Sequence, residues 1–259
     1  MALLEIRGLT KFFGGLRAVH NFTVSIEKGE LVGLIGPNGA GKTTVFNMIT
    51  GMLPPTSGSV VFEGRSLVGM PPYRILQAGI ARTFQNIRLF GGTTVLNNVL
   101  TPLGYRIGYN LLDAAAQTPR YLQREDEARA YARELLETLG LGGRAEELAR
   151  NLPYGLQRRL EIARALASRP RLLLLDEPAA GMNPAEVAAM VELIRYIREK
   201  FDLTVFLIEH QMGMVMNLCP RILVMDFGEI IAEGSPAEIQ SNERVLEAYL
   251  GRRGYAAAG

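Results

Sequence analysis

The sequence has little cysteine and no long apolar run, and each shortage excludes a class of protein. Cys219 is the single cysteine of the 259 residues, so no disulfide can form within the chain, and the low count is typical of a reducing compartment. No run reaches the ~18 apolar residues that a membrane-spanning helix requires. Residues 1–7 lack the basic-then-apolar order of a secretory signal. We therefore expect a cytosolic chain, which would reach a membrane only by binding a protein that spans it.

Charge of one sign is also lacking. The 28 Lys and Arg residues nearly balance the 26 Asp and Glu residues, which leaves a formal net charge of +2. Basic residues are scattered apart from short pairs such as Arg158-Arg159, whereas nucleic-acid-binding domains gather them on one face. We expect no nucleic-acid partner. Apolar residues make up 48% of the chain, which is ordinary globular usage and is enough for one large domain or a core with a smaller inserted lobe.

Short apolar runs alternate with helical patterns along the chain. Residues 31–35, 172–175 and 204–208 are such runs, as expected of strands buried on both faces of a parallel sheet. Residues 3–9 and 19–26 alternate partly between apolar and polar side chains and predict antiparallel strands. Because each buried run is followed by polar or Gly-rich residues and then by a helical pattern, the sequence predicts an α/β fold. Its core would be a doubly wound parallel sheet, accompanied by an antiparallel β subdomain.

The clearest helix start is the segment Asn183-Pro184-Ala185-Glu186, whose residue types fit a cap, a first-turn proline and a capping box. This helix is expected to run to about Lys200. Strand signals vanish between Gln85 and Asn151, where a helix is predicted over residues 123–139. We therefore predict a helical lobe inserted into the α/β core. The mixed pattern of residues 104–120 supports no assignment.

The segment Gly36-Pro37-Asn38-Gly39-Ala40-Gly41-Lys42-Thr43 fits the Gly-x4-Gly-Lys-Ser/Thr pattern of a phosphate-binding loop. It follows the strand predicted over residues 31–35 and precedes a helix from Thr43 to about Thr50. Successive backbone N–H groups at a helix N-terminus can surround phosphate oxygens if no Cβ blocks the approach, which explains the glycines. Lys42 would reach the β- and γ-phosphates, and the Thr43 hydroxyl would bind Mg²⁺. The predicted ligands are ATP and Mg²⁺, with the nucleotide held by Gly36, Pro37, Asn38, Gly39, Ala40, Gly41, Lys42, Thr43 and Thr44.

Two acidic residues, Asp176 and Glu177, end the buried run of residues 172–175. In an open α/β sheet, ligands bind at the carboxyl ends of the strands. Asp176 would hold Mg²⁺, and Glu177, which would point the other way, could orient or deprotonate the attacking water. Beside a phosphate loop, this pair favours nucleotide hydrolysis over a solvated strand end.

The segment Leu152-Pro153-Tyr154-Gly155-Leu156-Gln157-Arg158-Arg159-Leu160 precedes that strand. Here the chain resembles the ABC ATPases, whose signature reads Leu-Ser-Gly-Gly-Gln, and the other family elements follow in order along nearly the whole chain. The resemblance implies that Phe13 stacks on adenine and that Ala179 to Asn183 forms the D-loop. It also implies that Gln85, at the join of core and lobe, takes part in catalysis and in binding Mg²⁺, and that His210 senses the γ-phosphate.

The family resemblance also implies an architecture and a mechanism. One ATPase domain of residues 1–259 would comprise a P-loop (RecA-like) α/β core of residues 1–85 and 171–259 and a helical lobe of residues 86–170 with the signature helix. Two such domains pack head to tail, so that each ATP is held by one phosphate loop and by the signature helix of the other domain. ATP thereby holds the dimer together, and hydrolysis releases it. The signature contacts would come from Tyr154, Gly155 and Leu156.

The chain departs from the family signature at Pro153, where the serine is expected. Proline offers neither a hydroxyl nor a backbone N–H, so two donors to the γ-phosphate in the partner domain are missing. Tyr154 adds bulk where the family has a glycine. We expect a weaker ATP-driven dimer than a serine signature would give.

Several segments are similar to one branch of the family, the ATPase subunits of branched-chain amino acid importers. They include Arg82-Thr83-Phe84-Gln85, Arg158-Arg159-Leu160-Glu161-Ile162-Ala163-Arg164, Ile208-Glu209-His210, the residues around 104–120 and the ending Ala248-Tyr249-Leu250-Gly251. The branch usually has an acid where this chain has Gln211. Urea or short-chain amide importers and lipopolysaccharide exporters use similar ATPases and remain alternatives.

The branch resemblance implies an assembly at the cytoplasmic face of the cell membrane. A second ATPase, identical or related, would pair with this one, two polytopic permease subunits would span the bilayer, and a binding protein outside would deliver the solute. A soluble ABC ATPase that acts on ribosomes or DNA usually has two ATPase units or a long coiled-coil insertion, and this sequence has neither. A P-loop kinase or GTPase would leave the residues around Gly155 and His210 unexplained.

Overall fold

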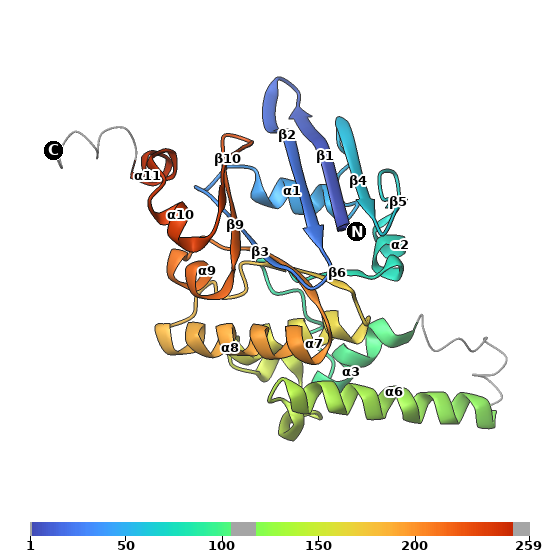
Figure 1. The fold of residues 1–259 in the computed structure, drawn as a ribbon. Coiled ribbons are helices and arrows are strands. Elements are labelled where there is room, and N and C mark those ends of the chain that lie inside the picture. The colour runs from blue at the N-terminus through green and yellow to red at the C-terminus, as the bar shows by residue number, and fades with distance from the viewer. Residues whose placement is uncertain (1, 105–117, 251–259) are drawn as a thin grey trace. The chain divides into compact units, whose positions relative to one another are not determined.

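The computed structural model describes residues 2–104 and 118–250, so most of the segment 104–120 and the chain from 251 lie outside the described residues. The chain divides into two compact units (Figure 1). The first comprises Met1–Arg82 and Arg171–Gly259, and the second comprises Thr83–Pro170.

The first unit contains a six-stranded sheet that is parallel except for its last strand. Its strand order is β10-β9-β3-β8-β7-β6, with β10 antiparallel to β9. Every residue of β3, β7 and β8 is buried. The prediction of buried parallel strands at these three places is therefore confirmed. The strands are β3 (Leu31–Ile35), β6 (Ile80–Arg82), β7 (Leu172–Asp176), β8 (Thr204–Ile208), β9 (Arg221–Asp226) and β10 (Glu229–Gly234).

A second, four-stranded antiparallel sheet of order β2-β1-β4-β5 completes the strands described in this unit. The predicted antiparallel strands at residues 3–9 and 19–26 are confirmed, but both are longer than predicted. They pair across several register shifts, which interrupt the apolar–polar alternation on which the prediction depended. The strands are β1 (Ala2–Phe13), β2 (Leu16–Glu27), β4 (Ser57–Phe62) and β5 (Arg65–Ser66).

The described helices of the first unit follow the strands in α/β order. At the start of α8, Asn183 and Glu186 form the predicted capping box, in which the Glu186 N–H donates to Asn183 Oδ1 and the Asn183 N–H donates to Glu186 Oε2. Gly33 brings α9 close to β3, because a Cβ there would lie 2.9 Å from Val215 Cγ1. The helices are α1 (Lys42–Ile49), α2 (Pro72–Ala78), α8 (Pro184–Lys200), α9 (Met212–Leu218), α10 (Pro236–Gln240) and α11 (Glu243–Leu250).

The second unit is helical in its described part, as the loss of strand signals predicted. Its long helix begins four residues earlier than position 123, because Thr118 caps it through the Tyr121 N–H and Pro119 occupies the first turn. The described elements are α3 (Val95–Leu100), η1 (Thr101–Leu103), α6 (Pro119–Thr138), η2 (Gly142–Arg144), η3 (Ala149–Asn151) and α7 (Tyr154–Ala167).

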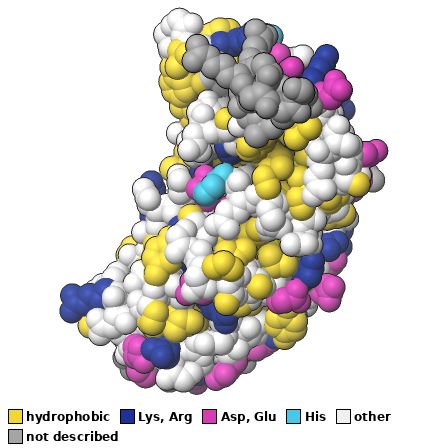
Figure 2. Space-filling model, turned by 90° about the vertical axis from the view of Figure 1, so that its left-hand side faces the viewer, with side chains coloured by type: hydrophobic (Ala, Val, Ile, Leu, Met, Phe, Trp, Pro, Cys, Tyr) yellow, Lys and Arg dark blue, Asp and Glu magenta, His cyan; other side chains and the backbone are white. Residues whose placement is uncertain are grey.

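The surface and the helices agree with the composition. Figure 2 shows basic and acidic side chains interspersed over one face of the molecule. Within residues 2–104 and 118–250, no helix is both long enough and apolar enough to cross a membrane. Cys219 is buried, and burial raises the pKa of its thiol far above the usual range, so this cysteine behaves as a small apolar core residue.

Candidate functional site

The predicted phosphate loop connects β3 to α1 in the first unit. Gly41 is the N-cap of α1, with φ of 103°, and no side chain caps this end of the helix. Lys42 begins the helix and folds back over the loop, where its Nζ donates to the carbonyl oxygens of Gly36 at 2.7 Å and Pro37 at 2.9 Å. The loop and its lysine therefore form one compact element at the carboxyl end of a buried strand, where the N–H groups of the helix favour an anion.

The glycines of this loop are required by the protein itself as well as by a phosphate. A Cβ at Gly36 would lie 2.0 Å from the Met225 carbonyl oxygen, and a Cβ at Gly41 would lie 2.4 Å from the Ala18 carbonyl oxygen. At Gly39 no atom lies within 4 Å of such a Cβ, although φ is +83°. The approach of a phosphate, which the sequence predicts as the reason for all three glycines, is therefore an incomplete explanation for Gly36 and Gly41.

Substitution of Gly36 by Ala is expected to disrupt the loop, whereas Gly39→Ala is the matched control. The first change forces the loop away from β9, and the second costs only the ~1–2 kcal/mol of a left-handed residue. Thermal unfolding and ATP affinity, measured for both variants, check this. Equal tolerance of the two changes would show that contact with β9 does not shape the loop.

Asp176 and Glu177 lie at the carboxyl end of β7, as predicted. Asp176 is 1% exposed and Glu177 is 8% exposed. Glu177 has φ of +48°, a left-handed conformation that costs energy outside glycine and is often found at functional sites. Its N–H donates to the Ile208 carbonyl at 2.9 Å, which ties it to the neighbouring strand β8. Its Oε2 lies 3.4 Å from Nδ1 of His210, so the structure brings these two predicted catalytic residues together.

Lys42 lies within electrostatic reach of the same carboxylates. Burial lowers the pKa of Lys42, while the charges of Glu177 and Asp176 oppose that shift. The phosphate loop, the carboxylates and His210 therefore converge at the carboxyl ends of β3, β7 and β8. This arrangement could hold a polyphosphate against the loop and place a base beside its terminal phosphate.

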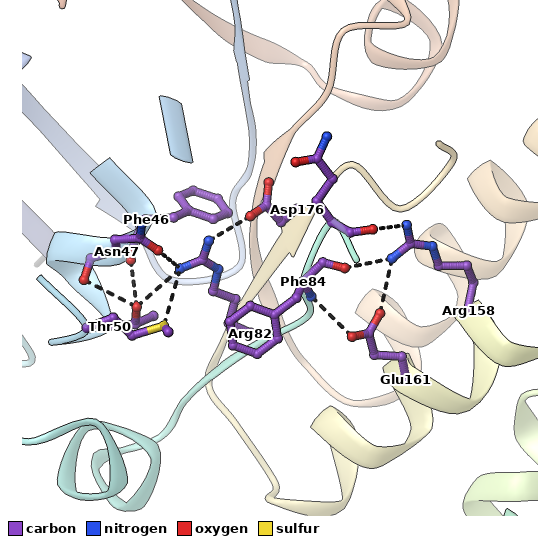
Figure 3. A network of polar contacts seen from close by, with 10 residues as sticks. Phe46, Asn47, Thr50, Arg82, Phe84, Arg158, Glu161 and Asp176 are labelled. Atoms are coloured by element: carbon purple, nitrogen blue, oxygen red, sulfur yellow. Dashed lines mark hydrogen bonds and ion pairs between the residues drawn. The ribbon is translucent and has the colours of Figure 1, made fainter. Parts of the chain in front are cut away.

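Arg82 is a member of this site that the sequence reasoning missed. Its guanidinium donates to Asp176 Oδ2 at 2.7 Å, and both side chains are almost fully buried. The same group donates to Asn47 Oδ1 at 2.7 Å and lies over the Phe46 ring, both on α1 (Figure 3). Arg82 thus links Asp176 to the helix that follows the phosphate loop. The sequence signal was an arginine at the end of an apolar triplet, which indicates nothing without its partners.

Glu209 is a second missed residue, although its segment was quoted for the family branch. It is fully buried and accepts the backbone N–H groups of Ala179 at 3.0 Å and His210 at 3.1 Å. Gln211 also links the His210 segment to Ala179, because its Nε2 donates to the Ala179 carbonyl at 3.1 Å. Burial raises the pKa of Glu209, and these N–H donors oppose the shift. Glu209 therefore holds the predicted D-loop and the His210 segment together.

Phe13 lies at the end of β1 with 48% of its surface exposed, so it is not a core residue. Lys11 Nζ lies 5.3 Å from the centre of its ring. An exposed aromatic ring is free to stack on a flat ligand, and the adenine contact stays a prediction.

The signature segment and Gln85 belong to the second unit. Helix α7 begins at Tyr154, with Pro153 as an N-cap that makes no side-chain capping bond. The Leu156 N–H donates to the Pro153 carbonyl at 2.9 Å. Among the three predicted signature donors, Tyr154 and Gly155 are therefore better placed than Leu156 to donate to a phosphate. The Gln85 carbonyl accepts a hydrogen bond from Arg158 on the same helix.

Known proteins match this chain over most of its length. The ABC transporter family model matches residues 19–180, and the model described as branched-chain amino acid ATP-binding cassette transporter matches residues 229–255. The high-affinity branched-chain amino acid transport ATP-binding proteins BraF of Pseudomonas aeruginosa and LivG of Escherichia coli K12 are 45% and 44% identical, over 96% of this chain and 98% of each relative. A solved ATP-binding cassette of an ABC transporter, in its ADP conformation, superposes with a TM-score of 0.84 at 32% identity, covering 97% of this chain and 100% of that one.

Proposed function

The chain belongs to the ABC transporter family and is one of its transport-coupled ATPases, and we propose that it powers the import of branched-chain amino acids. The observation that carries the substrate class is the match over nearly the full length to ATPases named for branched-chain amino acid transport, including the C-terminal segment 229–255. The lipopolysaccharide export ATPase LptB of Escherichia coli K12 is also similar, at 34% identity. Its lower identity favours the importer over the exporter.

The nucleotide would bind in the first unit with its phosphates on residues 36–44. Lys42, whose Nζ bonds the Gly36 and Pro37 carbonyls, would bind the β- and γ-phosphates. The Thr43 hydroxyl and the Asp176 carboxylate are hard oxygen ligands and fit Mg²⁺, which such sites usually hold with one or two protein oxygens and the phosphates of the substrate. When bound, Mg²⁺ neutralises charge that develops on the transferred phosphate.

Glu177 would act as the base for the attacking water. It lies in a nearly water-excluded position at the strand end, 3.4 Å from His210. His210, whose side chain is 46% exposed, would contact the γ-phosphate and fix the orientation of Glu177. Glu209 would couple this pair to the D-loop through the Ala179 N–H.

We propose an assembly of two ATPase subunits, two polytopic permease subunits and, indirectly, an extracytoplasmic binding protein, with this chain on the cytoplasmic face. ATP would bias the equilibrium between separated and paired ATPases, and hydrolysis would reverse the bias. Affinity purification of the tagged chain from detergent-solubilised native membranes tests this proposal. Recovery of two polytopic proteins and a second ATPase supports it. Recovery of soluble partners only, such as ribosomal proteins, would overturn the transport role.

Replacement of Pro153 by Ser is expected to tighten the nucleotide-dependent dimer about 10-fold or more. The change restores an N–H and a hydroxyl at the N-cap of α7, and a hydrogen bond to a charged group contributes ~1.5–3 kcal/mol. Pro153→Ala restores the N–H alone and separates the two contributions. Sedimentation of each variant with ATP, in a background that does not hydrolyse it, measures the effect. If neither variant tightens the dimer, the signature proline is not what weakens it.

A further inference from the structure

Arg158 and Glu161 form an ion pair inside the second unit. They lie one turn apart on α7, Arg158 NH1 is 3.2 Å from Glu161 Oε2, and both side chains are 2% exposed. Burial raises the pKa of Glu161, while Arg158 and two backbone N–H groups oppose the shift. A buried pair loses its hydration and is maintained only when further hydrogen bonds satisfy both partners. The partners of these further hydrogen bonds therefore indicate the role of the ion pair.

The further bonds converge on the backbone of residues 84–88, the Gln85 loop (Figure 3). Arg158 donates to the carbonyl oxygens of Phe84, at 2.6 Å, and of Gln85. Glu161 Oε1 accepts the N–H groups of Phe84 at 3.3 Å and Arg88 at 3.4 Å. Donors and acceptors of the loop backbone are thus both bound by one pair of side chains, which fixes the loop to α7.

The same guanidinium also reaches the first residue of the helix. Arg158 Nη2 donates to the Tyr154 hydroxyl at 3.0 Å, and the guanidinium carbon of Arg158 lies 5.4 Å from the centre of the Tyr154 ring. One planar group therefore bridges the Gln85 carbonyl and the residue that begins α7. Tyr154 stands where the family has a glycine, and from the sequence only the size of its side chain was considered. In the structure its hydroxyl accepts a hydrogen bond from Arg158.

We propose that Arg158 and Glu161 are positioning residues that make the Gln85 loop and the N-terminal turn of α7 move as one element. A displacement of the Gln85 backbone is then transmitted through the Arg158 guanidinium to Tyr154 and Gly155, and a displacement of Tyr154 and Gly155 is transmitted back in the same way. This inference rests on the proposed function, because it assumes that nucleotide contacts the signature turn. The fork of arginine is essential, since lysine offers a point charge that cannot hold two carbonyls and a hydroxyl in a fixed geometry.

Hydrogen exchange of the full chain with and without ATP tests the inference, using Arg158→Lys in a background that binds but does not hydrolyse ATP. In the unchanged chain, the amides of Phe84 and Arg88 and those of Tyr154 and Gly155 should gain protection together when ATP is added. In Arg158→Lys the Phe84 and Arg88 amides should exchange faster, because their acceptor Glu161 loses the guanidinium that fixes it. We expect a factor of at least about five, which is comparable with the net contribution of one hydrogen bond. In this variant the two segments should no longer gain protection together when ATP is added. Arg159→Lys on the same helix, outside the pair, is the matched control and should keep the joint response.

Two outcomes overturn the inference and can be told apart. The first outcome is that ATP binds but the two segments gain protection together in Arg158→Lys as well, or independently of each other in the unchanged chain. In either case Arg158 and Glu161 do not couple the segments, and the ATPase function stands. If ATP does not bind the unchanged chain, both the inference and the proposed function fail. A kinetic measurement in the chain that hydrolyses ATP distinguishes positioning from stabilisation. There, Arg158→Lys alone should lower kcat about 10-fold with an unchanged KM for ATP. A parallel loss of kcat, ATP affinity and Tm would indicate a structural role only and overturn the proposal.

Discussion

Replacement of Glu177 by Gln is expected to slow ATP hydrolysis by at least ~100-fold, a typical effect of losing a general base, while ATP still binds. The amide has nearly the same shape as the carboxylate, so the left-handed backbone and the contact with His210 at 3.4 Å can persist. What is lost is the ability to accept a proton from water. Release of phosphate at saturating ATP and equilibrium binding of ATP, measured side by side, check the two parts of this prediction.

The outcome that contradicts the role of Glu177 is a normal rate of hydrolysis in the variant. Glu192→Gln serves as the control, because its side chain is exposed on α8 and pairs with Arg195 on the surface. That change should alter neither the rate nor the affinity. A loss of ATP binding in Glu177→Gln would instead show that the carboxylate holds the phosphate loop in place.

Lys42→Ala is expected to weaken ATP binding about 10- to 100-fold, because charge-assisted hydrogen bonds contribute ~1.5–3 kcal/mol each. Lys42 lies within electrostatic reach of Asp176 and Glu177, whose charges oppose the lowering of its pKa by burial. Without it, the phosphates would meet two carboxylates with less compensation. Lys28→Ala is the matched control, since Lys28 pairs with Asp202 on the surface. Titration with ATP measures both, and an unchanged affinity in Lys42→Ala would limit the lysine to the hydrolytic step.

Much of the core could be predicted because its signals are local. The apolar runs that became β3, β7 and β8 are buried along their whole length, and burial on both faces leaves few other interpretations. The capping box at Asn183 depends on residues only three positions apart, so the sequence contains all of it. For the same reason, β3, the loop of residues 36–41 and α1 form the expected strand–loop–helix element.

What could not be predicted depends on partners distant in sequence. The role of Arg82 depends on its ion pair with Asp176, which is 94 residues away in the sequence. The clash that requires Gly36 comes from the Met225 carbonyl. Arg158 and Tyr154 are one turn apart, yet their common target is the Gln85 backbone, 73 residues from Arg158. Each of these residues has an ordinary surface or loop interpretation until the fold brings its partner into contact.

We propose that hydrolysis at this chain powers the uptake of branched-chain amino acids. The decisive test is ATP hydrolysis by the complete membrane complex, reconstituted in vesicles with its binding protein. We expect leucine, isoleucine or valine to stimulate hydrolysis, and Glu177→Gln to abolish the stimulated rate. A rate that is indifferent to all three amino acids, in a complex that still hydrolyses ATP, would contradict the claim.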